Sequence, residues 1–305
     1  MFGVMIGIST VWRSKLIEDS KELLEALAPL PFSALELDYR ISESVFKDIK
    51  QYLKKDWQVL SIHNYFPRPD SIPLAKASAD MFLLSNPDKE ERLLAIKATI
   101  RSIEIANDLE AYAVVIHLGR VEMENEFSKW KELYISGQLE KEKGFVDAKL
   151  KERKEKVQKY VDAALLSLDK LLPRAEKLGI KLGIENRYYF HEIPNYEEMK
   201  VILETFAGAS LGYWHDVGHA EVLARLGICP HEKWLSTYGD YLLGTHIHDV
   251  KDLDDHLAPG QGTVNFDKII PYLKKASVKI FEIHPKSTAQ QIEAGFDYLK
   301  EKGLE

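Results

Sequence analysis

The chain has 305 residues, of which 45% are hydrophobic and 29% are charged, with 17 glycines and 12 prolines. This composition is that of a globular protein, and it excludes disordered, collagen-like and low-complexity chains. Lys and Arg number 41 against 48 Asp and Glu, a net charge of -7, so the bulk charge gives no reason to expect nucleic-acid binding.

The sequence has no feature of a membrane or secreted protein. No stretch approaches the roughly 18 apolar residues of a membrane span. The apolar start, Met1–Ile8, has no basic region and is too short for a signal-peptide core. Cys229 is the single cysteine, which rules out an intrachain disulfide and favours a reducing compartment. We therefore expect a cytoplasmic protein without membrane association.

Short apolar or β-branched runs alternate along the chain with longer segments of helical period. The short runs predict strands at Val4–Ser9, Ala34–Asp38, Val59–His63, Ala113–His117, Lys181–Glu185, Leu211–Asp216, Leu242–His246 and Lys279–Ile283. The longer segments predict helices at Asp19–Leu27, Ser44–Leu53, Glu90–Asn107, Tyr160–Lys177, Tyr196–Phe206, His219–Leu226, Phe266–Lys274 and Thr288–Lys300. Eight such units predict an α/β fold, a single (β/α)₈ TIM barrel spanning residues 1–305 as one domain.

Two connections exceed the 2 to 6 residues usual for a loop between strand and helix. Asn64–Asn86 follows the third strand and Gly119–Lys159 follows the fourth, so both should border the mouth at the carboxyl ends of the strands. In the second connection, Phe127, Trp130 and Tyr134 are spaced like one face of a helix. We expect a helical excursion at about 119–159 packed on the barrel rim, with a mobile lid or an oligomer contact as the alternatives.

Almost every strand from the third onward finishes in a residue that can bind a metal ion. Together with neighbouring loop residues, the set is His63, His117, Glu185, Asp216, His219, His246, Asp254, His256 and Glu282. Imidazole nitrogens and carboxylate oxygens suit Zn²⁺ and, with more oxygen, Mn²⁺ or Co²⁺. Carboxylates crowded into one mouth would repel one another without a cation, so the pattern predicts a metal centre.

Spacing adds detail to this set. In Asp216-x-x-His219 the Asp ends a strand and the His lies in the first helical turn, so both can face the mouth while binding different ions. In Asp254-x-His256 an extended loop would place both side chains on one side, where they can bind a single ion. His248 lies on the same strand face as His246, beyond the strand end, and is a candidate to support a ligand.

The motifs resemble those of the xylose-isomerase-like TIM barrel superfamily, which includes sugar phosphate isomerases and epimerases and AP endonuclease family 2, over essentially the whole chain. The specific parts are Gly183-Ile184-Glu185-Asn186, Asp216-x-x-His219, His246-x-x-Asp249 and Asp254-x-His256-x-x-x-Gly260-x-Gly262. The endonuclease IV class of abasic-site endonucleases in this superfamily implies three zinc sites. They would be held by His63, His117 and Glu185; by Glu185, Asp216, His246 and Glu282; and by His219, Asp254 and His256.

The ketohexose epimerases and related isomerases of the same superfamily imply a single ion, Mn²⁺, Co²⁺ or similar. That ion would be held by Glu185, Asp216, His246 and Glu282. The resemblance implies that Glu185 and Glu282 flank the carbon whose proton moves. This chemistry is coherent, because a cation stabilises charge developing next to a carbon acid while carboxylates take and return the proton. One ion is therefore expected, with up to three under the endonuclease pattern.

The rest of the mouth favours a small substrate. The loop Tyr39–Ser44 has a single Arg, whereas an abasic-site endonuclease needs a basic surface there. Tyr65-Phe66 is interpreted as a hydrophobic wall for a small ligand rather than as a wedge for DNA. Arg120, Arg187 and Glu192 are further candidates for substrate contact.

We therefore predict a divalent-metal-dependent sugar or sugar-phosphate isomerase or epimerase with Glu185 and Glu282 as catalytic residues. The alternative is a zinc phosphodiesterase of the endonuclease IV type, the one reading that includes a nucleic-acid partner. A non-catalytic sugar-binding barrel is disfavoured, because binding alone needs no pair of carboxylates around one ion. Xylose isomerase itself is disfavoured, because Gly179–Ile184 lacks its lysine-bearing motif. Self-association is compatible with either enzyme.

Overall fold

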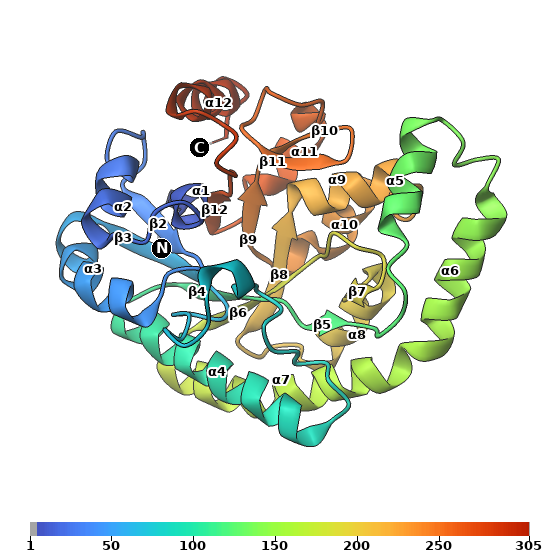
Figure 1. Ribbon diagram of the computed structural model, residues 1–305, viewed down its shortest axis with the longest axis horizontal. Coiled ribbons are helices and arrows are strands. Elements are labelled where there is room, and N and C mark those ends of the chain that lie inside the picture. The colour runs from blue at the N-terminus through green and yellow to red at the C-terminus, as the bar shows by residue number, and fades with distance from the viewer. Residues whose placement is uncertain (1–4, 305) are drawn as a thin grey trace.

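A computed structural model describes residues 5–304 of the chain (Figure 1). Eight parallel strands close into a barrel in the order β1-β12-β9-β8-β6-β4-β3-β2, so the predicted α/β TIM barrel is confirmed. The barrel strands are β1 (Met5–Ser9), β2 (Ala34–Leu37), β3 (Gln58–His63), β4 (Ala113–Ile116), β6 (Lys181–Glu185), β8 (Leu211–Asp216), β9 (Leu242–Ile247) and β12 (Val278–Phe281). Each overlaps a predicted strand. Val4, predicted to begin the first one, lies outside the described residues.

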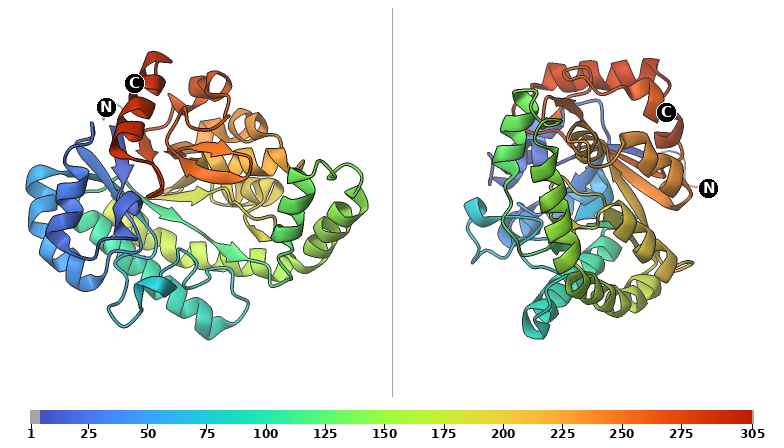
Figure 2. Two further views of the ribbon diagram at one scale, coloured as in Figure 1. Left: turned by 45° about the horizontal axis from the view of Figure 1, so that its top comes forward. Right: turned by 90° about the vertical axis from the view of Figure 1, so that its right-hand side faces the viewer.

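Helices surround the strands in all three ribbon views (Figures 1 and 2). They are α1 (Val11–Ser14), α2 (Ser20–Leu27), α3 (Glu43–Asp56), α4 (Lys89–Asp108), α5 (Phe127–Ile135), α6 (Lys143–Lys156), α7 (Gln158–Leu178), α8 (Tyr196–Thr205), α9 (Val217–Arg225), α10 (His231–Tyr238), α11 (Phe266–Leu273) and α12 (Ala289–Glu301), with 3-10 turns η1 (Leu74–Lys76) and η2 (Gly239–Tyr241). Two short antiparallel ribbons lie outside the barrel. They pair β5 (Gly119–Arg120) with β7 (Glu192–Ile193) and β10 (Asp249–Lys251) with β11 (Asp254–Leu257).

Alternate residues of each barrel strand face the interior, which large and small side chains fill together. The indole of Trp214 is fully buried inside the barrel. Gly183 and Gly244, on the two strands that flank β8, leave room for it, because a Cβ atom there would lie 2.7 and 2.2 Å from the indole. Trp214 therefore fills the interior and contacts His246, with ring centroids 5.4 Å apart.

The long connection after β4 forms a helical excursion, α5 and α6, which lies at the right-hand side of the molecule in Figure 1. Its aromatic residues pack inward on the loop that follows β6. Trp130 is buried with its ring 4.4 Å from that of Phe190, and Phe127 lies 4.8 Å from Tyr189 between ring centroids. The predicted helix with one aromatic face is therefore present, and that face is its contact with the barrel.

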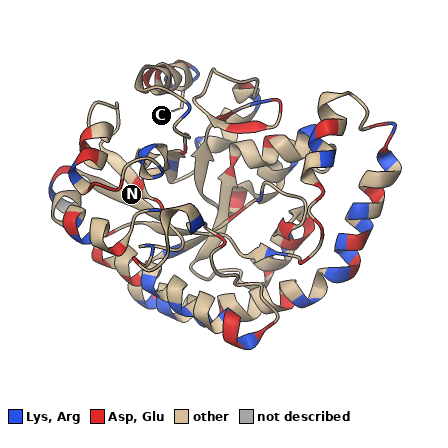
Figure 3. Cartoon of the chain, in the orientation of Figure 1, with Lys and Arg blue, Asp and Glu red and all other residues tan. Residues whose placement is uncertain are grey.

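The outer helices carry charges of both signs. Along α6, Lys and Arg are interspersed with Asp and Glu (Figure 3). Ion pairs such as Lys151–Glu155 and Lys156–Glu152 join successive turns of this helix. None of the helices within residues 5–304 has the length and apolar character needed to cross a membrane.

Candidate metal centre

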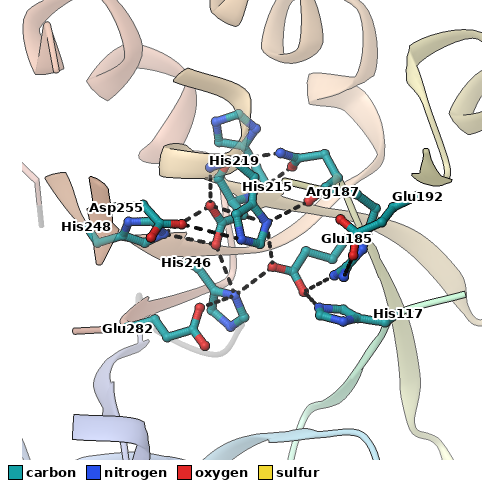
Figure 4. Close-up of polar contacts among 12 residues, drawn as sticks. His117, Glu185, Arg187, Glu192, His215, His219, His246, His248, Asp255 and Glu282 are labelled. Carbon is teal, nitrogen blue, oxygen red and sulfur yellow. Dashed lines mark hydrogen bonds and ion pairs between the residues drawn. The ribbon is translucent and has the colours of Figure 1, made fainter. Parts of the chain in front are cut away.

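The strand ends bring a dense group of imidazoles and carboxylates to the carboxyl face of the barrel (Figure 4). Glu185, Asp216 and His246 are the last inward-facing residues of β6, β8 and β9, and Glu282 directly follows β12. Small or apolar residues stand two positions earlier on the same faces, where they fill the barrel interior. The period of two in each strand therefore places the polar side chain at the mouth.

Glu185, Asp216, His246 and Glu282 form the inner group, whose ligand atoms all lie within 4.8 Å of one another. His246 Nδ1 is 3.1 Å from Glu282 Oε2, 3.3 Å from Glu185 Oε1 and 3.7 Å from Asp216 Oδ2. All four residues are buried. Three buried carboxylates around one imidazole nitrogen need a compensating cation, so this donor set fits a divalent metal ion.

The neighbouring side chains keep the carboxyl groups of the inner group ionised. Burial raises the pKa values of the three carboxyl groups, but neighbouring imidazoles outweigh it and hold them well below their usual values. His117 and His246 lower the pKa of Glu185, and His246 and His256 lower that of Glu282. Burial likewise lowers the pKa of His246, but Glu282, Glu36 and Glu185 raise it well above the ordinary value.

A second group consists of His63, His117 and Glu185. His117 Nε2 lies 2.7 Å from Glu185 Oε2, and His63 Nε2 lies 3.5 Å from the same oxygen. His63 Nδ1 donates to the carbonyl oxygen of Asn64, which leaves Nε2 directed at Glu185. Glu185 thus belongs to both this group and the inner one, as the resemblance to endonucleases implied.

A third group differs from the predicted one by one residue. The structure gathers His219, Asp255 and His256, and it places Asp254 elsewhere. Asp254 Oδ1 accepts from Lys286 Nζ at 2.6 Å, and its side chain is 62% exposed. The expectation that residues i and i+2 share one side requires an extended backbone, but His256 has a positive φ of 55°. This left-handed residue breaks the alternation, so Asp255 takes the place expected for Asp254.

His248 supports Asp216 from behind. Its Nδ1 accepts from the backbone N–H of His256 at 2.9 Å, which assigns the proton to Nε2. Nε2 then donates to both carboxylate oxygens of Asp216, each 3.0 Å away. Gly218 makes this possible, because a Cβ atom at that position would lie 2.1 Å from the imidazole of His248. The glycine in Asp216-x-Gly218-His219 is therefore required for this packing.

A pocket of about 360 Å³ opens above these groups, and predicted residues Arg187 and Glu192 line it. Arg187 Nη2 lies 2.8 Å from Glu192 Oε1 and 3.3 Å from Oδ2 of Asp80. Asp80 belongs to the long connection after β3, which therefore borders the mouth as expected. From the connection after β4, Phe127 borders it indirectly by packing against Tyr189.

Three predicted substrate contacts do not reach the pocket, and their assignment is corrected. Tyr65 and Phe66 are 2% and 1% exposed and belong to the hydrophobic core. Tyr65 OH donates to the carbonyl oxygen of Phe82, and the backbone N–H of Phe66 donates to Ser102 Oγ. Arg120 is exposed on the β5–β7 ribbon, outside the pocket lining. Both rings lie in the core, where the Tyr65 hydroxyl and the Phe66 backbone N–H find hydrogen-bond partners. The apolar character of the pair did not by itself distinguish a core position from a pocket wall.

Comparison with known proteins identifies the family. The family model described as "Xylose isomerase-like TIM barrel" matches residues 24–302. The chain belongs to the xylose isomerase-like TIM barrel family. A relative, an uncharacterized protein of Methanocaldococcus jannaschii, is 24% identical over 281 residues, which cover 86% of this chain and 82% of that protein.

Two solved structures illustrate the likeness in fold. D-psicose 3-epimerase with D-tagatose, from Clostridium cellulolyticum H10, is 14% identical, with a TM-score of 0.67 and 99% of each chain covered. The IolI protein with a binding zinc atom is 16% identical, with a TM-score of 0.63, covering 98% of this chain and 96% of that one. At this identity the likeness is one of fold.

In this member of the xylose isomerase-like family, sequence reasoning missed four residues at the site: Glu36, Asp80, Asp255 and His284. Asp80 and His284 line the pocket, and the ring of His284 stacks on that of His256 at 3.9 Å between centroids. Burial lowers the pKa of His284 to about 2, so its imidazole is neutral. Glu36 carried a usable signal, because it is a charged residue at an inward-facing position within a predicted strand.

Proposed function

We propose that this protein is a divalent-metal-dependent isomerase or epimerase of a sugar or sugar phosphate. The observation that carries the proposal is the inner group, in which Glu185 and Glu282 lie on either side of His246 Nδ1, at 3.3 and 3.1 Å. Solved structures of the same fold with D-tagatose and with zinc support it. So does the pocket above the group, which has the size of a small-molecule site.

In this proposal the two glutamates hold the ion and move the proton. The ion, held by Glu185, Asp216, His246 and Glu282, would stabilise negative charge that develops on the substrate's carbonyl oxygen. Burial raises the pKa values of both glutamate carboxyl groups, but neighbouring imidazoles outweigh it and hold them below the ordinary range, so each carboxylate is ionised before substrate binds. For epimerisation, one glutamate would take the proton from carbon as a carboxylate, while the other, which must first gain a proton from solvent, would give that proton to the opposite face of the carbon.

The charges of the pocket favour an uncharged sugar over a sugar phosphate. Its lining contains two arginines, Arg40 and Arg187, and both are already paired with carboxylates. Arg40 Nη1 lies 3.0 Å from Asp38 Oδ1. Asp80 Oδ1 and His117 Nδ1 make no hydrogen bond among the described residues but lie 3.7 Å from each other, and Nε and Nη1 of Arg187 likewise have no hydrogen-bond acceptor there, so donors and acceptors remain for substrate hydroxyls.

The endonuclease-type phosphodiesterase is a second candidate because of the two outer groups, His63–His117–Glu185 and His219–Asp255–His256. Together with the inner group they could hold three ions. Other observations weigh against it. Tyr65 and Phe66 are buried and so are not available to insert between bases, and Arg40 is paired with Asp38.

The first test replaces the proposed acid/base groups. Glu185→Gln and Glu282→Gln should each abolish turnover of ketose substrates, because loss of the proton-transfer group alone costs about 10²–10⁴-fold. Turnover should be measured with excess Mn²⁺ or Co²⁺, and bound metal quantified in parallel. A variant that keeps near-normal turnover at full metal loading would remove that glutamate from the mechanism.

The second test separates the two candidate functions through the outer histidines. For an isomerase, His117→Ala and His256→Ala should reduce turnover about 10–100-fold, as changes around a metal centre usually do. For a phosphodiesterase each should cost several orders of magnitude, because the outer ions would activate water and stabilise the leaving oxygen. Both variants are assayed for sugar isomerisation and for cleavage of abasic-site DNA. DNA cleavage that depends on both histidines would reject the isomerase.

A further inference from the structure

Glu36 is a buried carboxylate below the mouth of the barrel. It lies within β2, is 0% exposed and does not line the pocket. Its Oε2 accepts from Ser61 Oγ at 2.8 Å and lies 3.1 Å from His246 Nε2. Its Oε1 has no hydrogen-bond partner among the described residues. Ser61 is uncharged, so among the described residues His246 is the one group within hydrogen-bond distance that can balance the charge of this carboxylate.

The Glu36–His246 contact crosses the barrel interior. β2 is hydrogen-bonded to β1 and β3, whereas β9, which carries His246, lies between β12 and β8. Trp214, also in the interior, packs against the His246 ring. A buried carboxylate lowers stability unless a charged or hydrogen-bonding group compensates it. A carboxylate at this interior position is therefore expected to serve a function.

The two nitrogens of His246 face different surroundings. Nε2 faces Glu36, and Nδ1 faces Glu282, Glu185 and Asp216 at 3.1, 3.3 and 3.7 Å. A metal-binding imidazole uses the lone pair of one nitrogen, and the hydrogen bond made by the other nitrogen determines which one is free.

We propose that Glu36 is a positioning residue that accepts the Nε2 proton of His246 and so reserves Nδ1 for the metal ion. The inference rests on the metal site of the proposed function. It adds Glu36, which is outside every motif that supplies a metal ligand, to the residues that shape this site. Glu36 acts through His246, and its negative charge strengthens the imidazole as a ligand. Ser61, on the neighbouring strand β3, donates the other hydrogen bond to the same carboxylate oxygen.

The test measures metal binding rather than turnover. Glu36→Gln keeps the shape of the side chain and its contact with Ser61 but removes the charge. In chelator-treated protein titrated with Co²⁺, calorimetry and the visible d–d absorption should report a Kd about 10–100-fold weaker than that of the unsubstituted protein. Ser61→Ala is the matched control, since it removes the other hydrogen bond to the same oxygen, and it should change the Kd less than about 3-fold.

A double-variant comparison isolates the route through His246. In a His246→Ala background, adding Glu36→Gln should weaken Co²⁺ binding no further, because the residue it acts through is gone. An equal loss in both backgrounds would overturn the positioning role. So would wild-type Co²⁺ affinity and absorption in Glu36→Gln. If the unsubstituted protein binds no Co²⁺, Mn²⁺ or Zn²⁺, the proposed function fails together with this inference.

A measurement on the unsubstituted protein tests the same assignment without depending on whether a variant folds. Nitrogen-15 NMR of histidine-labelled, Zn²⁺-bound protein distinguishes the protonated nitrogen of His246 from the metal-bound one. We expect a proton on Nε2 and the metal on Nδ1. Metal bound through Nε2, or an Nε2 without its proton, would overturn the assignment of Glu36.

Discussion

At the scale of single residues, the site shows how partners decide the role of a polar side chain. Arg187 and Glu192 line the pocket but bind each other, with Asp80 as a third member of the cluster. Burial raises the pKa of Asp80, but Arg187 and then His117 outweigh burial and hold it below the usual range. Asp80 is therefore a carboxylate at the pocket wall, placed to hold Arg187 and accept from a substrate hydroxyl.

Asp80→Asn should weaken substrate binding more than it slows the chemistry. We expect KM for the preferred ketose to rise about 10-fold with a smaller change in kcat, because Asp80 is outside the inner group and one charge-assisted contact is worth about 1.5 kcal/mol or more. Asp70→Asn, in the same connection, is the control: Asp70 is exposed and accepts from Ser44, so neither constant should change. A fall in kcat with unchanged KM would contradict the binding role.

At the scale of elements, each connection after a strand imposes its own local geometry on the ligands. α9 begins directly after β8, and Asp216 accepts from the backbone N–H of His219 at 2.7 Å as the N-cap. This cap holds the carboxylate of Asp216 and the imidazole of His219 together at the N-terminal end of α9, at the mouth of the barrel. In the β10–β11 ribbon, the left-handed backbone of His256 turns both Asp255 and His256 toward the site.

Gly218→Ala tests the packing between α9 and His248, which follows β9. The added methyl group would collide with His248, which holds Asp216, so we expect a loss of about 1–3 kcal/mol in unfolding free energy and weaker metal binding. Gly144→Ala in α6 is the matched control, because nothing lies within 4 Å of its Cβ. It should stabilise the protein slightly through helix propensity. Denaturant melts and Co²⁺ titrations of both variants measure the difference, and equal stability of the two would refute the proposed collision.

At the scale of the whole molecule, closure of the barrel concentrates charges that are far apart in the sequence. Glu185, Asp216 and Glu282 come from β6, β8 and the end of β12, and their carboxylates share one buried space with His246. Imidazoles lie among these charges, and Glu282, Glu36 and Glu185 outweigh burial to raise the pKa of His246 above its ordinary value. A bound divalent ion would replace these interactions with direct coordination and tie the strand ends together.

Removal of metal should therefore lower the melting temperature of the whole chain. Binding to the folded state alone stabilises by about 4 kcal/mol when the free ion exceeds its Kd 1,000-fold. Differential scanning calorimetry of chelator-treated protein, before and after addition of Mn²⁺, Co²⁺ or Zn²⁺, measures the shift. In Asp216→Asn, addition of the ion should raise the melting temperature by much less than in the unsubstituted protein. An unchanged melting temperature with millimolar ion would argue against a specific metal centre.

The amino-acid sequence alone determined the barrel and most of the candidate site. Strand alternation is a local property of the backbone, so the runs ending at Glu185, Asp216 and His246 predicted both the strands and which side chains reach the mouth. Because parallel strands of a barrel end at one face, these residues had to converge.

Only the tertiary structure decided which neighbours complete that site. Glu36 meets His246 across 210 positions of sequence, and barrel closure brings them together. Asp255 replaces Asp254 because one residue, His256, adopts a left-handed backbone that spacing rules do not anticipate. Tyr65 turns into the core because its hydroxyl finds the carbonyl of Phe82 there. In the first and third cases the deciding factor is a contact between separate segments, and in the second it is the backbone conformation of one residue; local periodicity encodes neither.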